Sequence, residues 1–150
     1  VVETVLGFTN ISFVAKTIDW NPAHMYQTLH TAYHHRGLSF VQILQRCPTY
    51  TPHMFDQWRS NPDAVRLLVH QDGVPADGPV AKMYTNQVEH DPSDLATARQ
   101  LASDPERIPI GLLYRNPQAR RYDEITVRGH DMPVEEKLEA LERELDRFAI

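Results

Sequence analysis

Cysteine is nearly absent from this sequence, because Cys47 is the only one among 150 residues. A lone thiol cannot form an internal disulfide, so nothing in the sequence requires an oxidising compartment. No apolar run reaches the length of a membrane span, and the first residues lack the basic and then apolar pattern of a signal peptide. These absences predict a cytoplasmic protein with no membrane partner.

Glycine is also scarce, with six residues in the whole chain. There is no G-x-x-x-x-G-K-[ST] or G-x-G-x-x-G segment to bind phosphate, and no G-x-S-x-G turn to hold a nucleophilic serine. The formal net charge is −5 and the basic residues form no stripe, which argues against nucleic acid as a partner. With 41% hydrophobic and 23% charged residues, the composition is that of an ordinary globular domain.

The clearest local pattern is a strand, a helix and a second strand joined by short connections. Residues 11–15 favour a strand, Asn21 suits the N-cap of a helix, and Gly37 suits a left-handed cap at its end. The following run Leu38–Leu44 is typical of a buried strand. Such a unit favours a parallel sheet, in which ligands gather at the carboxyl ends of the strands. Cys47 follows the second strand, so we expect an α/β fold with its thiol at a functional edge.

The middle of the chain has shorter patterns. Residues 53–60 fit a short helix, and residues 63–84 contain two apolar runs around a turn rich in Gly, Pro and Asp, which suggests a hairpin. Residues 89–103 contain a predicted helix, with Asp91 or Ser93 as its cap.

The last third of the chain predicts a strand, a loop and a helix. Gly111 lies inside the strand Ile108–Arg115, where it would allow close backbone approach, and residues 116–125 suggest a loop. The tail is predicted to be an amphipathic helix with apolar residues at heptad spacing, Leu138, Leu141, Leu145 and Phe148. We therefore divide the chain into an α/β part, 1–126, and a helical tail, 127–150.

Three of the eight histidines lie close together in the sequence. His30 and His34 are four residues apart on a predicted helix, with His35 beside them, and this spacing can present two imidazoles to zinc. A third ligand would have to come from a distant histidine, such as His53, His70 or His90. Many solvated helices share this spacing, so a polar helix end that satisfies backbone carbonyls is the favoured alternative.

Four segments occur in a recognisable order along residues 11–126. They are SFVAKTIDWNPAHM, HHRGLSFVQILQRCPTYT, EHDPSDLATARQLAS and RIPIGLLYRNPQARRYDE. Together they contain a strand that leads into a helix with His24 near its start, an Arg36–Gly37 turn, a loop with proline and cysteine, and an IPIGLLY strand. In this order the segments resemble the C-terminal half of the β subunit of 2-oxoacid:ferredoxin oxidoreductases, which binds thiamine diphosphate.

The resemblance implies a fold, an activity and a set of partners. The fold would be part of a thiamine-diphosphate-binding, three-layer α/β domain with a mostly parallel sheet and a C-terminal amphipathic helix. The enzyme would oxidatively decarboxylate a 2-oxoacid to acyl-CoA with thiamine diphosphate and magnesium, and pass electrons through a 4Fe–4S cluster to ferredoxin. Its partners would be the N-terminal half of the β subunit and an α subunit that holds the remaining domains.

The resemblance also implies roles for the loop after the second strand. Cys47 would be a ligand of the 4Fe–4S cluster, and the adjacent Pro48 and Thr49 would contact the cofactor. An aromatic residue, Tyr50, follows the threonine, and this is closer to the members that use 2-oxoglutarate than to those that use pyruvate. From the residues alone, a partly buried thiol that acts as a small hydrophobe is the simpler interpretation, because one cysteine cannot hold a cluster.

Two parts of the family pattern are missing from this sequence. The GDG…N segment for magnesium and pyrophosphate is absent, and so are three further cluster cysteines. Because the chain enters core-like sequence at Val1, we expect it to be a segment that is inactive alone and that an N-terminal segment completes. The alternatives are a noncatalytic assembly module and a small zinc hydrolase built on His30 and His34.

Overall fold

Strands and helices alternate through most of the chain. The computed structural model describes residues 1–126 and 132–148. The strands are β1 (Phe13–Ile18), β2 (Ser39–Leu44), β3 (Val65–Val69), β4 (Gln87–Glu89) and β5 (Ile108–Arg115). The helices are α1 (Val2–Val5), α2 (Pro22–His34), α3 (Asp56–Arg59), α4 (Gly78–Met83), α5 (Leu95–Ala102), α6 (Tyr122–Thr126) and α7 (Val134–Asp146), with a 3₁₀ turn at Pro62–Ala64.

The five strands form one mixed sheet in the order β2-β1-β5-β3-β4. The pairs β2–β1, β5–β3 and β3–β4 are parallel, whereas β1 and β5 are antiparallel. The predicted α/β fold with a mostly parallel sheet is therefore confirmed. Because the strand direction reverses between β1 and β5, the carboxyl ends of the strands lie at two opposite edges of the sheet. β1 and β2 end at one edge, and the other three strands end at the opposite one.

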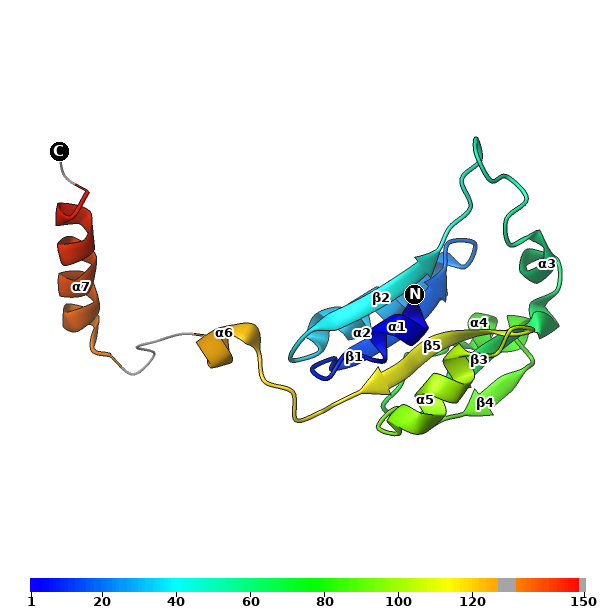
Figure 1. Ribbon diagram of the computed structural model, residues 1–150. Coiled ribbons are helices and arrows are strands. Elements are labelled where there is room, and N and C mark those ends of the chain that lie inside the picture. The colour runs from blue at the N-terminus through cyan, green and yellow to red at the C-terminus, as the bar shows by residue number, and fades with distance from the viewer. Residues whose placement is uncertain (127–131, 149–150) are drawn as a thin grey trace.

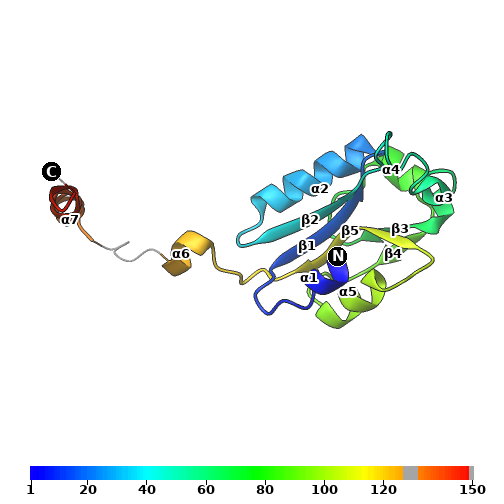
Figure 2. The same ribbon diagram turned by 45° about the horizontal axis from the view of Figure 1, so that its top comes forward.

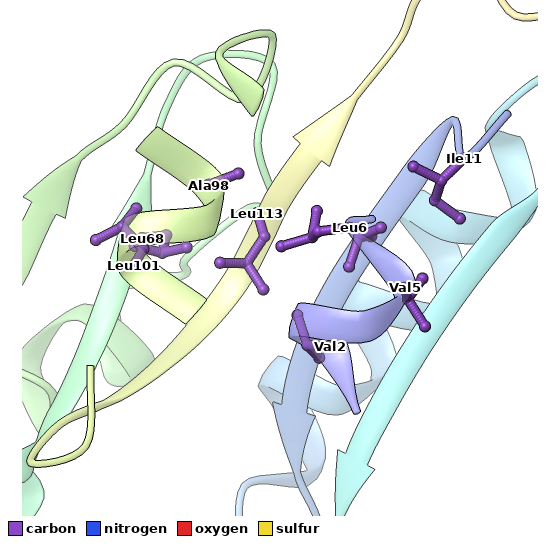
Figure 3. Packing of buried hydrophobic residues seen from close by; sticks show 9 residues of the cluster. Val2, Val5, Leu6, Ile11, Leu68, Ala98, Leu101 and Leu113 are labelled. Atoms are coloured by element: carbon purple, nitrogen blue, oxygen red, sulfur yellow. The ribbon is translucent and has the colours of Figure 1, made fainter. Parts of the chain in front are cut away.

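Helices cover both faces of the sheet, which gives three layers (Figure 2). On one face, α1 and α5 bury a cluster around Leu6 and Leu101 against Val14, Leu68 and Leu113 of the central strands (Figure 3). On the other face, α2 and α4 cover the sheet and bury residues that include Ala32 and Tyr84. The core thus sits on both sides of β1, β5 and β3, whose side chains alternate between the two faces.

The helix α2 begins as predicted but ends and packs differently. Asn21 accepts a hydrogen bond from the backbone N–H of His24 at 3.1 Å, which confirms the N-cap. The helix ends at His34 with an extended residue at its cap, so the predicted left-handed cap at Gly37 is wrong. Gly37 has φ +114° because it lies in the turn into β2, where a Cβ would lie 2.6 Å from Ser12 Oγ.

Two strand predictions need correction. β2 was expected to be buried, but it is half-buried because it lies at the edge of the sheet and pairs with β1 alone within the described chain. The predicted hairpin over residues 63–84 is wrong, because β3 is the only strand in this range and its parallel partner β4 follows a crossover. The second apolar run of that region forms α4, whose Val80 and the following Tyr84 are four residues apart and point into the core.

The later strand and helix form where predicted, with differences at the cap of α5 and in the loop after β5. β5 has the predicted bounds, and Gly111 has φ +116°, with Leu68 of β3 against its Cα. The cap of α5 is Asp94, which accepts from the N–H groups of Ala96 and Thr97, so both predicted caps were misplaced. The predicted loop after β5 contains α6 at its end.

The tail forms the predicted amphipathic helix α7, and its apolar side chains are exposed. Glu139 and Arg143 form an i,i+4 ion pair at 3.8 Å. Both views show α7 apart from the sheet (Figure 1). Residues 127–131 and 149–150 of the predicted tail lie outside the described residues, and the division at residue 126 stays a prediction.

Candidate functional site

The loop that carries Cys47 begins where the two parallel strands β1 and β2 end. The backbone N–H of Asp19, just after β1, donates to the carbonyl of Leu44, the last residue of β2, at 3.1 Å. This bond holds the two strand ends side by side. Cys47 follows three residues later, so the predicted position at a carboxyl edge of the sheet is correct.

Two hydrogen bonds between Cys47 and Thr51 close the loop into a compact turn. The backbone N–H of Thr51 donates to the Cys47 carbonyl at 2.9 Å, and the Cys47 N–H donates to Thr51 Oγ1 at 3.1 Å. Pro48 within this closure and Pro52 directly after it restrict the backbone. The turn therefore presents the thiol in a defined orientation.

Backbone N–H groups of the turn surround the sulfur of Cys47 and stabilise its thiolate form. Tyr50 N–H donates to Cys47 Sγ at 3.4 Å. This hydrogen bond is the main cause that lowers the pKa of the thiol below its ordinary value, and the N–H groups of Thr49 and Thr51 act in the same direction. The side chain is half-buried. A thiolate that is stabilised in this way is a good metal ligand, since the thiolate and not the thiol binds metal.

Pro48 and Thr49 form the exposed tip of the same turn. The backbone of Thr49 contributes to the low pKa of Cys47, as described above. The predicted contacts of these two residues with a cofactor stay predictions.

An aromatic group flanks the cysteine loop on the side of α3. The ring of Phe55 lies 6.2 Å from that of Trp20 and 5.6 Å from that of Trp58, measured between centroids. Phe55 has φ 74°, a left-handed conformation that is unusual for an aromatic residue. The tryptophans pack against the core cluster of β3 and α4.

A cavity of about 270 Å³ lies on the sheet next to this aromatic group, and Trp58 and Phe55 line it. Lys16 and Gln42, neighbours on β1 and β2, form part of its floor. Burial lowers the pKa of Lys16, and Glu3 partly offsets this effect. Lys16 is not among the site residues predicted from the sequence, although a lysine within the apolar run ISFVAKTI is a visible signal.

The histidines do not assemble into a site with three ligands. His30 and His34 lie together, but His35 turns away, and its Nε2 lies 3.1 Å from Ser12 Oγ. Across residues 1–126 and 132–148, no three His, Cys, Asp or Glu side chains could hold one metal ion. The zinc hydrolase alternative is therefore not supported, because catalytic zinc takes three protein ligands. The same residues contain no helix long and apolar enough to cross a membrane.

Comparison with known proteins agrees with the segments found in the sequence. The family described as the C terminal of the pyruvate ferredoxin oxidoreductase beta subunit matches residues 80–129. The chain is 28% identical, over 79% of its length, to subunit beta of 2-oxoacid:ferredoxin oxidoreductase 2 from Aeropyrum pernix. The beta subunit of 2-oxoacid:ferredoxin oxidoreductase from a Sulfolobus species is also 28% identical over 79% of this chain. The resemblance to a 2-oxoacid:ferredoxin oxidoreductase β subunit is confirmed.

A solved structure of the same kind supports the fold. It is 2-oxoglutarate:ferredoxin oxidoreductase from Magnetococcus marinus with 2-oxoglutarate, coenzyme A and succinyl-CoA bound. The match has a TM-score of 0.55 and 28% identity, and it covers 87% of this chain and 40% of that chain. The chain spans 35% of the length of each curated β subunit above. Together with the match to the C-terminal family, this coverage likens the chain to a C-terminal segment of such a subunit.

Proposed function

We propose that this chain is part of an enzyme that oxidatively decarboxylates a 2-oxoacid to acyl-CoA and transfers the electrons to ferredoxin. The similarity to β subunits of this enzyme class supports the proposal. The partners would be an α subunit, the remaining part of the β subunit, ferredoxin and coenzyme A. A reducing compartment suits the unpaired thiol, so we propose a cytoplasmic location.

The observation that carries the proposal is the environment of the Cys47 sulfur. The Tyr50 N–H donates to this sulfur, and the turn closed by Thr51 holds it at a strand end. Hydrogen bonds to a thiolate ligand tune the potential of an iron–sulfur cluster, and such clusters are held by cysteine thiolates. We assign Cys47 as one ligand of a 4Fe–4S cluster, with Pro48 and Thr49 at its margin.

The residues of this chain fit one part of the cluster site and leave the rest to other residues. A 4Fe–4S cluster takes four thiolates, and the sequence has one cysteine. Three ligands must therefore come from outside these residues, and we place them in the N-terminal part of the β subunit. No residue here is assigned to thiamine diphosphate or magnesium. When bound, the thiamine cofactor supplies the decarboxylation chemistry and the cluster supplies one-electron transfer.

The substrate that we favour is 2-oxoglutarate. Tyr50 follows Thr49 in the loop, and an aromatic residue at this position resembles the family members that use 2-oxoglutarate. The solved structure that matches this chain is a 2-oxoglutarate enzyme by its description. Both observations support a dicarboxylic 2-oxoacid over pyruvate.

A noncatalytic assembly module is the second candidate function. It is favoured by the apolar face of α7, where Leu138 and Leu141 are each 55% exposed and Leu145 is 61% exposed. Such a face suits a contact with another chain. A module of this kind would need no cluster, so the iron content of the complex distinguishes the two candidate functions.

The test is the iron and acid-labile sulfide content of the complete complex, purified without oxygen. The wild-type complex should contain a 4Fe–4S cluster with its visible absorption, and Cys47→Ala should lose the absorption and the ferredoxin reduction. Tyr50→Phe is the matched control, because the donor to the sulfur is the backbone N–H and the side chain is 86% exposed. This control should keep its iron.

Two results would contradict the proposal. One is a wild-type complex without iron, which would favour the assembly module. The other is a Cys47→Ala complex that keeps full absorption and electron transfer, which would mean that the fourth ligand lies elsewhere. Size-exclusion chromatography of the variants confirms that any loss of iron does not come from loss of assembly.

A further inference from the structure

The outer face of α2 carries a pair of imidazoles that the proposed function does not use. His30 and His34 are exposed, and their Nε2 atoms lie 3.2 Å apart. Their ring centroids are 4.5 Å apart at an interplanar angle of 65°. In this arrangement one imidazole donates its Nε2–H to the Nε2 of the other. Figure 2 shows α2 in the outer layer of the fold, over β1 and β2.

The separation of the two nitrogens matches the bite of a metal chelate. Zinc–imidazole bonds are about 2.0–2.1 Å long, so two nitrogens on one ion at right or tetrahedral angles lie roughly 2.8–3.4 Å apart. The observed distance falls in this range without any change of backbone. We propose that His30 and His34 form a two-histidine binding site for a divalent transition-metal ion such as Zn²⁺.

Neighbouring aromatic side chains hold the two rings in place. Tyr26, one turn before His30, stacks on its ring with centroids 5.9 Å apart. Tyr33 lies edge-on against His34 at 5.2 Å. Such packing restricts the imidazole orientations, which lowers the entropy cost of bringing both nitrogens onto one ion. The third histidine, His35, is directed toward Ser12 and Phe13 and is not a ligand.

The electrostatics of α2 also favour a cation at this position. His34 is the last residue of the helix, where the unpaired carbonyls carry the negative end of the helix dipole. The helix sequence PAHMYQTLHTAYH contains no Lys or Arg that would repel the ion. Because the described residues offer no third ligand, the remaining positions on the ion are open to water or to an outside ligand.

This site differs from the zinc hydrolase considered above, because it has two protein ligands, whereas catalytic zinc takes three. It holds the ion reversibly, and late first-row ions that favour imidazole, Cu²⁺, Ni²⁺ and Zn²⁺, are the expected occupants. The site does not depend on the proposed oxidoreductase function, because its ligands and their neighbours all lie in one helix.

The experiment is a calorimetric titration of the complex with Zn²⁺ at pH 7.5, with the imidazole ¹⁵N resonances of the labelled chain as a second readout. The wild type should bind one Zn²⁺ at this site, with the Nε2 resonances of His30 and His34 shifted together. His30→Gln and His34→Gln should each lose this binding. His53→Gln is the matched control, since that histidine is also exposed but pairs with Asp56, and it should bind as the wild type does.

Two outcomes would overturn the inference. Either the wild type shows no shift of the two Nε2 resonances with Zn²⁺, or both glutamine variants bind as tightly as the wild type does. Circular dichroism of each variant checks that α2 remains folded, so that a loss of binding reports the ligands.

Discussion

His24 shows at the scale of one residue how burial controls charge in this fold. Its ring is fully buried in the first turn of α2, and Nδ1 lies 2.8 Å from Thr17 Oγ1 on β1. Within the described chain, Nε2 has no hydrogen-bond partner. Burial lowers the pKa of this histidine from 6.5 to about 4. The imidazole is therefore neutral at physiological pH.

The low pKa of His24 predicts a loss of stability in mild acid. Between pH 6.5 and about 4 the unfolded chain binds a proton that the folded chain does not, so the free energy of unfolding decreases as the pH falls. The decrease should be about 3 kcal/mol between pH 7.5 and pH 4, since one pKa unit corresponds to about 1.4 kcal/mol. Urea denaturation at a series of pH values measures it.

Two variants isolate the contribution of His24. His24→Asn should flatten the slope of stability against pH over this window, whatever its effect at pH 7.5. Gly78→Ala should leave the slope unchanged, because it removes no ionisable group and nothing lies within 4 Å of a Cβ at that position. A His24→Asn chain with the full wild-type slope would show that other groups cause the acid sensitivity.

At the scale of elements, the pairing of β3 with β5 depends on one glycine. Gly111 has φ +116°, and a Cβ there would lie 3.0 Å from the Leu68 carbonyl oxygen and 3.1 Å from the Leu68 Cβ. The carbonyl belongs to the backbone of β3, so it cannot move aside without disturbing the sheet. Close approach of the two central strands therefore requires a residue without a side chain.

Gly111→Ala should destabilise the chain by about 3 kcal/mol, from backbone strain and the clash with Leu68. Gly78→Ala is the matched control, because nothing lies within 4 Å of a Cβ at that position, and its effect should stay within about 0.5 kcal/mol. Thermal unfolding of both variants measures the difference. Equal stabilities would mean that β5 can shift to accept the methyl group.

Elements with local signals were predictable, and those that depend on partners were not. Asn21 marks the start of α2, and the apolar run of β5 has turn or loop sequence on both sides. By contrast, the buried face of α2 is formed by His24, Thr28 and Ala32, while Leu29 is 43% exposed. Thr28 can be buried because its hydroxyl donates to the His24 carbonyl at 2.8 Å. This compensation depends on side-chain geometry, which hydropathy does not report.

At the scale of the whole molecule, the two edges of the sheet differ. The edge strand β4 has three residues and offers a short template for pairing. The other edge strand, β2, has six residues of the sequence SFVQIL, all half-buried or exposed. Long edge strands with β-branched and aromatic residues tend to pair with another chain. If the proposed function is correct, the β2 edge is where we expect the remaining part of the β subunit to pair with this chain.

If this expectation is correct, the segment expressed alone should self-associate through β2. Ile43 is 41% exposed on that strand, and Ile43→Lys should reduce the association by placing a charge on the edge. Leu38→Lys is the matched control, because this residue is 64% exposed but precedes the strand. Sedimentation velocity measures the difference. An equal effect of both variants would indicate general hydrophobic association instead of edge pairing.

The sequence alone was sufficient for the α/β class, for the position of Cys47 after a strand and for the family resemblance, because each depends on residues that are adjacent in the chain. A strand pattern, a cap and a turn act within a few residues, so their signals survive without knowledge of distant contacts.

Only the tertiary structure decided which strands are neighbours and which side chains meet. The antiparallel β1–β5 pair, which gives the sheet two carboxyl edges, joins residues about a hundred positions apart. The hydrogen bond from Tyr50 to the Cys47 sulfur and the 3.2 Å separation of the His30 and His34 nitrogens depend on backbone and rotamer geometry. Spacing in the sequence permits such contacts, and packing determines whether they form.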